Sequence, residues 1–429
     1  MKSEFVIAIL LTLAGIIKGQ QRSMWYETLP NEKLEGVPRI IRDYERSFPA
    51  FKNMFLESIG RSNTDIILKE AIKRQKAQKP INASVPFFCD VTIGRSKERP
   101  TSVHALRPGD IDVIAAIGDS LTAGNGALAL NPQHLYVENR GICGMIGGQG
   151  NWRKFLTLPN ILKEFNPKLV GYATADSFTW HPESQFDIGE AGAMVQDLPF
   201  MTKQLVKRIK KHPKVDFQKD WKLVSLLIGA NNLCVDICYV RNLTETVEDR
   251  RRNLIHAFKY LKDNMPRTIV NFIHMPDIKA LHECDGVPLS CNLLHKFECP
   301  CLFTLQFKSR LAEFFKTLKE WQRVDDEVTR DPQFRMKEDF AIVLQNFTKH
   351  LRFPPKTDST GKSTCDLTYL SEDCFHFSQK GYARATNALW NNMLEPDGFK
   401  TPSWPKEFEK FLCPTERSPY IYTWKNSRL

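Results

Sequence analysis

Ser120 ends a run of small and β-branched residues in the segment DVIAAIGDSLTAGNG, residues 112–126. A serine hydroxyl is a weak nucleophile until a neighbouring base takes its proton. Of the ten histidines, His376 is the best candidate for that base, because it lies in a polar segment three residues after Asp373. An aspartate at this spacing can accept the imidazole N–H and stabilise the imidazolium. These three residues predict nucleophilic acyl transfer.

Each of these residues also has a structural interpretation. Ser120 could cap the helix that follows it, since serine is common at helix N-termini. A lone histidine before a helix, such as His376, is more often a surface or capping residue. The Asp-x-x-His pair lies in a segment that also contains Cys374, and a crosslinked loop favours the catalytic interpretation.

Acyl transfer also needs hydrogen-bond donors aimed at the developing oxyanion. Asn231, in the segment LLIGANNLC, follows a predicted strand and offers a carboxamide. Gly192, in the segment FDIGEAGAMVQDL, is predicted at a helix start, where its backbone N–H has no intrahelical acceptor. The alternatives are that Asn231 makes a turn and that Gly192 only permits close packing.

From residue 110 onward, apolar strands alternate with amphipathic helices, which is typical of a parallel sheet covered on both faces. We expect strands at 111–117, 169–173, 222–228, 268–274 and 340–346. We expect helices at 159–166, 190–211, 246–264 (with Thr244 as the N-cap), 304–328 and 378–394. The cysteine-dense stretch 276–303 is expected to be a crosslinked loop. Ligands bind beyond the carboxyl ends of such strands, where Ser120 lies.

The two ends of the chain have their own composition. Residues 1–20 contain the short apolar run FVIAILLTLAGII after a lysine, which predicts a secretory signal peptide cleaved near Gly19 or Gln20. Residues 21–100 are expected to form a helical extension and connector, 101–400 the main domain, and 401–429 a tail packed on it. No later run is long and apolar enough to predict a transmembrane anchor, so we expect a secreted protein.

Cysteine usage agrees with an oxidising compartment. Disulfides are therefore expected, with candidates that include Cys234, Cys238, Cys365 and Cys374; zinc ligation by the ECPC segment is the rival interpretation. The remaining cysteines form a group between 284 and 301 and a pair at the two ends, Cys89 and Cys413, and Cys143 is left over. Three sequons predict glycosylation at Asn82, Asn242 and Asn346.

The formal net charge is +11, and much of it lies in residues 203–214. This segment could attract an anionic lipid surface, although the solvated face of an amphipathic helix, with Leu205 and Ile209 facing inward, is favoured. We expect no nucleic-acid partner, since the chain has no aromatic and basic binding module.

Taken together, these segments resemble conserved blocks of the GDSL/SGNH hydrolase superfamily. The matching segments are GDSLTAGNG, EAGA with a following DL, GANN and DCFHFSQKGY. The segments LRPGDIDVIAAIGDSLTAGNGA and CPTERSPYIYTWKNS are similar to the repeats of membrane-associated members of the phospholipase B subgroup. The resemblance covers roughly residues 86–429.

The resemblance implies a three-layer α/β/α sandwich with a five-stranded parallel sheet. It implies Ser120 as the nucleophile, His376 as general base and acid, Asp373 as its orienting partner, and an oxyanion hole from Ser120, Gly192 and Asn231. No metal or other cofactor is implied. The implied substrates are phospholipids and lysophospholipids, met at a lipid surface by a monomer. The alternatives are an esterase for short-chain or sugar-acetyl esters and a catalytically silent lipid-binding homologue.

The chain departs from the family pattern in three places. Asn232 replaces the aspartate of the Gly-x-Asn-Asp block, which keeps the shape but removes the charge. Cys143 and Gln149 stand where the subgroup tends to have a small residue and an aspartate. We expect a local adjustment at Asn232 and an altered pocket wall at the other two positions.

Overall fold

The computed structural model describes residues 65–357, 361 and 363–427, and its centre is a parallel sheet. The strands follow the order β1-β2-β3-β4, with bounds Ile111–Gly118, Trp221–Leu227, Thr268–Ile273 and Phe340–Gln345. One row of paired residues crosses the whole sheet, from Ile117 through Leu226 and Phe272 to Leu344. All strands run in the same direction, so their carboxyl ends meet at one edge.

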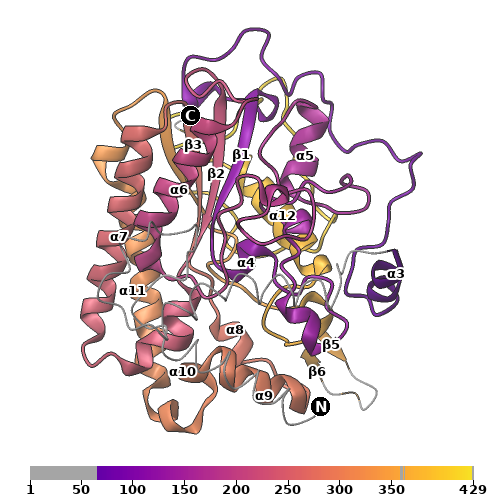
Figure 1. Ribbon diagram of the computed structural model, residues 1–429, viewed down its shortest axis with the longest axis vertical. Coiled ribbons are helices and arrows are strands. Elements are labelled where there is room, and N and C mark those ends of the chain that lie inside the picture. Colours follow the sequence, from indigo (N-terminus) through magenta and orange to yellow (C-terminus); the bar gives the residue numbers. More distant parts are fainter. Residues whose placement is uncertain (1–64, 358–360, 362, 428–429) are drawn as a thin grey trace.

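Helices cover both faces of this sheet (Figure 1). One face packs against α6 (Leu198–Lys211), α7 (Leu243–Asn264) and α11 (Leu311–Arg330). The other face packs against α5 (Leu158–Phe165) and α12 (Gln379–Met393). Alternate residues of β1 serve the two cores, because successive strand side chains point to opposite faces. The predicted parallel α/β sandwich is thus confirmed.

The predicted strand at 169–173 is absent from the sheet as a continuous element. Val170 makes one isolated parallel bridge to Val113, and farther along the same edge Asp187 bridges to Ala116. Gly171 has a φ of 98°, and a Cβ there would lie 2.3 Å from the carbonyl oxygen of Ile114. The chain therefore turns away after Val170, and two short segments cover the outer edge of β1 instead of a fifth strand.

Helix boundaries differ from the predicted ones where local backbone features intervene. The predicted helix 190–211 begins only at Leu198, since Gly192 has a φ of 82° and a 3₁₀ turn comes first. Asn242, and not Thr244, caps α7 by accepting a hydrogen bond from the Thr244 N–H. The predicted helix 304–328 starts at Leu311, after a 3₁₀ turn. The predictions for α5 and α12 are confirmed to within one residue.

The stretch 276–303 is helical, so its description as a loop is wrong. It contains α8 (Lys279–His282), α9 (Leu289–Glu298) and α10 (Pro300–Phe303), which lie at the end of the molecule where α4 (Ser120–Ala123) follows β1 (Figure 1). A small hairpin of β5 (Pro355–Thr357) and β6 (Ser363–Cys365) lies nearby. The cysteine-rich segment therefore covers the carboxyl edge of the sheet.

The chain ends lie partly outside the described residues. The predicted signal peptide and the part of the helical extension before Asp65 fall there, while α3 (Asp65–Lys73) is described. The later part of the chain crosses α12: the carbonyl of Lys410 accepts from Asn387 and Asn391. Within the described ranges, we find no helix with the length and apolar character needed to cross a bilayer.

Two surface predictions can be placed on this fold. The sequon residues Asn82 and Asn242 are exposed, whereas Asn346 is half-buried at the end of β4. In the basic segment, Leu205 and Ile209 of α6 are buried in the core, which supports the amphipathic-helix interpretation. Glycosylation itself stays a prediction.

Candidate active site

A sharp turn after β1 presents Ser120. The strand ends at Gly118, where a Cβ would lie 2.4 Å from the carbonyl oxygen of Leu227, so a larger residue does not fit. Asp119 then caps α4, its carboxylate accepting from the N–H of Leu121 at 3.0 Å. Ser120 is the first residue of that helix. It therefore lies at the carboxyl edge of the sheet, as predicted.

The structure brings Ser120, His376 and Asp373 into one series of hydrogen bonds. The Nε2 atom of His376 lies 2.8 Å from the hydroxyl oxygen of Ser120, and its Nδ1 atom lies 2.6 Å from Oδ2 of Asp373. The other carboxylate oxygen of Asp373 accepts the N–H groups of Phe375 and His376 at 2.9 and 3.0 Å. The loop thus fixes its own carboxylate against the imidazole.

Burial and hydrogen bonding set the charge of the two aspartates near this serine. Burial would raise the pKa of Asp373, but the charge of His376 and the hydrogen bonds that the carboxylate accepts hold that pKa below its ordinary value. Burial raises the pKa of Asp119 to about 6, and its backbone hydrogen bonds and the charge of His376 offset only part of this effect. Asp373 is therefore the ionised partner of the imidazole at neutral pH.

The two predicted oxyanion donors lie next to each other. The side-chain amide of Asn231 donates to the carbonyl of Ala193 at 2.9 Å, which ties it to the turn that contains Gly192. Gly192 is exposed and lies in this turn, not at the start of a helix as predicted. The same segment reaches the serine turn, because the N–H of Glu190 donates to the carbonyl of Gly118.

The departures from the family pattern also have definite places. Asn232 accepts the N–H of Val195 at 3.0 Å and donates to the side chain of Gln196 at 2.8 Å, and an aspartate could not make the second bond. The Cys143 thiol is buried and donates to the carbonyl of Leu121 beneath α4. Gln149 donates its backbone N–H to Gly141. The side chain of Cys143 lies in the core, and its effect on a pocket wall stays a prediction.

Five disulfides link the described cysteines, and Cys143 is free. The pairs are Cys89–Cys413, Cys234–Cys299, Cys238–Cys301, Cys284–Cys365 and Cys291–Cys374. All four candidate cysteines are thus in disulfides, and the cysteines of the ECPC segment are not available as zinc ligands.

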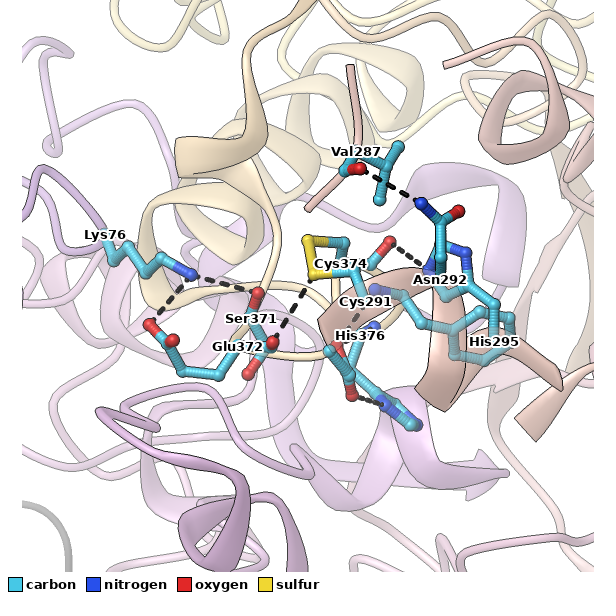
Figure 2. Close-up of a disulfide and its surroundings, with 11 residues drawn as sticks. Lys76, Val287, Cys291, Asn292, His295, Ser371, Glu372, Cys374 and His376 are labelled. Carbon is cyan, nitrogen blue, oxygen red and sulfur yellow. Dashed lines mark hydrogen bonds and ion pairs between the residues drawn. A yellow bond between two sulfur atoms is a disulfide. The ribbon is translucent and has the colours of Figure 1, made fainter. Parts of the chain in front are cut away.

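One of these disulfides brings α9 against the candidate catalytic loop. Cys374 lies between Asp373 and His376 in the sequence, and its partner Cys291 belongs to α9. Figure 2 shows Cys291 and His295 of α9 beside Cys374 and His376. This placement was not predicted, although the position of Cys374 indicated that its unknown partner would approach the site.

A third acidic residue, Glu298, also reaches this loop. One ligand atom each of Glu298, Asp373 and His376 lies within 4.8 Å of the other two. The atoms of Asp373 and His376 are joined by their own hydrogen bond, and the carboxyl of Glu298 lies beside this pair. A metal ion would have to break that hydrogen bond, so the group fits an ionisable network better than a metal site.

A parallel α/β sheet with a serine, a histidine and an aspartate linked at its carboxyl edge is the arrangement of a hydrolytic enzyme. Residues 114–389 match the family described as GDSL-like Lipase/Acylhydrolase. The chain belongs to this family, and it is a carboxylic ester hydrolase.

The relatives found include membrane-associated phospholipase B1 from human, mouse and rat. The identities are 38% over 389 residues, 36% over 384 and 35% over 383, each covering 89% of this chain. The chain spans a quarter of the length of these relatives, since 25% of each is covered. A solved structure from Streptococcus pneumonia aligns over 81% of this chain and 97% of its own, at 13% identity and a TM-score of 0.28, which is too weak to support an inference.

Proposed function

We propose that this protein is a secreted serine esterase that hydrolyses fatty acyl esters of phospholipids and lysophospholipids. The observation that carries the proposal is the hydrogen-bonded series from Ser120 through His376 to Asp373. The phospholipase B1 relatives support the choice of substrate.

In the first half of the reaction, the oxygen of Ser120 attacks the carbonyl carbon of the ester while its proton moves to Nε2 of His376. The ionised carboxylate of Asp373 stabilises the imidazolium through Nδ1. The imidazolium then gives this proton to the departing lysolipid or glycerophospho-alcohol oxygen, and an acyl-enzyme remains on Ser120. In the second half, water gives a proton to His376 and attacks the acyl carbon. The imidazolium then returns that proton to the departing oxygen of Ser120, and the fatty acid is released.

The oxyanion of each tetrahedral intermediate needs several donors. The N–H of Ser120 is available, because the first residues of a helix have no intrahelical acceptor. The amide of Asn231 has a second hydrogen beyond the one it gives to Ala193. We assign the third donor to the backbone N–H of Gly192, on the same turn.

Contact with a lipid surface is part of this proposal, and we assign it to the outer face of α9. Leu289, Leu293 and Phe297 are 75, 50 and 53% exposed and recur every fourth residue, so they form one apolar ridge. The exposed Lys296 lies beside the ridge, and the chain as a whole carries a net charge of +11. Apolar anchors with a neighbouring cation fit the interface of a phospholipid bilayer.

Secretion of a monomer is also proposed. The apolar run in residues 1–20 and the five disulfides support an extracellular location. Sequencing the N-terminus of protein from a secreting cell tests this: a start near residue 20 supports it, and an intact residue 1 contradicts it. Light scattering of the purified protein tests the monomer.

The decisive experiment is product analysis on a phosphatidylcholine with two different acyl chains. The wild type is expected to release fatty acid and lysolipid, whereas a folded Ser120→Ala variant is expected to release neither. Turnover by Ser120→Ala would refute the mechanism. Hydrolysis of short soluble esters alone would indicate the short-chain or sugar-acetyl alternative, and the absence of both turnover and labelling by a fluorophosphonate would indicate a silent homologue.

A further inference from the structure

The inner face of α9 touches the candidate catalytic loop at three successive points. Cys291 is bonded to Cys374, and the Nε2 atom of His295 lies 3.1 Å from the carbonyl oxygen of Cys374 (Figure 2). Glu298, three residues after His295, brings its carboxyl to Asp373. Residues spaced by three or four positions share one helix face, so α9 lies along the loop with this whole face.

One oxygen of the Glu298 carboxyl, Oε2, is buried without a hydrogen-bond partner in the described part of the chain. A buried polar atom without a partner costs free energy, so a proton shared with a neighbouring carboxylate is favoured. The carboxylate of Asp373 lies within 4.8 Å of the Glu298 carboxyl.

The carboxylate of Asp373 has one acceptor position left for such a bond. Its two oxygens offer about four lone-pair positions. Two backbone N–H groups, of Phe375 and His376, occupy one oxygen, and the imidazole of His376 occupies a position on the other. A protonated Glu298 can fill the fourth position without displacing any of these donors.

We propose that Glu298, carrying its proton, donates a hydrogen bond to Asp373 and so acts as a positioning residue that holds this carboxylate against Nδ1 of His376. The site is then a chain of four side chains, from Ser120 to Glu298. The inference rests on the proposed function, since it assigns a role within the same site.

The ionisable groups around Glu298 agree with a protonated carboxyl. Burial and the negative charge of Asp373 raise the pKa of Glu298 well above its ordinary value. His376 on the loop lies within 4.8 Å of Glu298, and Tyr136, from the segment before residue 140, interacts with its charge. His295 is one turn earlier on the same face of α9. Burial lowers the pKa of His295, which therefore remains neutral and offers Glu298 no positive charge.

Two substitutions distinguish a hydrogen-bonding role of the Glu298 side chain from a role in packing alone. Glu298→Gln keeps a neutral N–H donor of the same shape, and we expect its kcat to stay within about threefold of the wild type at pH 7. Glu298→Ala removes the donor, and we expect kcat to fall roughly tenfold with KM unchanged. Above the pH at which Glu298 ionises, the wild type is expected to lose activity while Glu298→Gln retains it.

The assay uses the full-length protein on a soluble ester, with the rate of fluorophosphonate labelling as a second measure of how reactive Ser120 is. Glu283→Gln is the matched control, since Glu283 is exposed in the same cysteine-rich segment. The inference would be overturned if Glu298→Ala kept the kcat of the wild type. It would also be overturned if Glu298→Ala and Glu298→Gln had equal melting temperatures and lost kcat equally. An inactive wild type that also resists labelling would instead overturn the proposed function.

Discussion

The Cys291–Cys374 disulfide allows a quantitative prediction, because a second crosslink runs beside it. Without a neighbouring crosslink, a disulfide that spans 83 residues would raise the free energy of the unfolded chain by about 4.5 kcal/mol, because it lowers the conformational entropy of that chain. Cys284–Cys365 already joins nearly the same two segments, so adding the second bond closes a ring of only about 16 residues. We therefore expect the double variant Cys291→Ala/Cys374→Ala to lose about 3 kcal/mol in the free energy of unfolding.

The measurement is urea unfolding without reductant, followed by far-ultraviolet circular dichroism. The matched variant is Cys234→Ala/Cys299→Ala, whose neighbour Cys238–Cys301 leaves a ring of about six residues and an expected loss of about 2 kcal/mol. If the neighbouring disulfides had no effect, the sequence separations of 83 and 65 residues would predict nearly equal losses in the free energy of unfolding for the two variants. Equal losses above about 4 kcal/mol would refute the reasoning.

Three further predictions concern charge and contact. Asp373→Asn should lower kcat by about 10³- to 10⁴-fold, because the imidazole loses its anionic partner; steady-state kinetics on a soluble ester measures this, and a loss under tenfold would contradict it. Asp119 has its pKa raised by burial from 3.8 to about 6, so its ionisation costs stability as pH rises through that interval. Asp119→Asn should thus be more stable than the wild type at pH 7, by up to about 3 kcal/mol, and equal to it near pH 4; equal midpoints of urea unfolding at both pH values would contradict this. Leu293→Ser with Phe297→Ser should weaken binding to phosphatidylcholine and phosphatidylserine vesicles by at least about tenfold in a flotation assay, yet leave soluble-ester hydrolysis within about twofold. Met336→Ser, which removes an 82% exposed methionine near the amino end of β4, is the control, and equal binding by all three proteins would argue against the ridge.

The sequence predicted correctly those features of the fold and the site that depend on residues close together in the chain. The apolar run before Ser120 predicted β1, and the Asp-x-x-His spacing predicted which carboxylate approaches His376. Both follow from short segments whose residues touch each other. The fifth strand was predicted wrongly for a local reason too: the apolar run at 169–173 contains Gly171, whose positive φ ends the strand pairing.

The contacts of α9 depend on tertiary pairing and were therefore outside the reach of the sequence. The sequence alone does not identify Cys291 as the disulfide partner of Cys374, since many pairings of the same cysteines are possible. Leu289, Leu293 and Phe297 of α9 are exposed, whereas Cys291 and His295 are buried, which reverses the usual pattern of an amphipathic helix. Glu298 could be recognised only once that pairing was known.

The position of Cys374 ties ester cleavage to the maturation of the chain. The Cys291–Cys374 disulfide anchors the loop between Asp373 and His376, and it forms only under oxidising conditions. A newly made, still reduced chain lacks this anchor, so we expect it to be a poor enzyme until it has entered an oxidising compartment. If the proposed phospholipid substrates are correct, this requirement would keep the newly made chain from hydrolysing the lipids around it before oxidation.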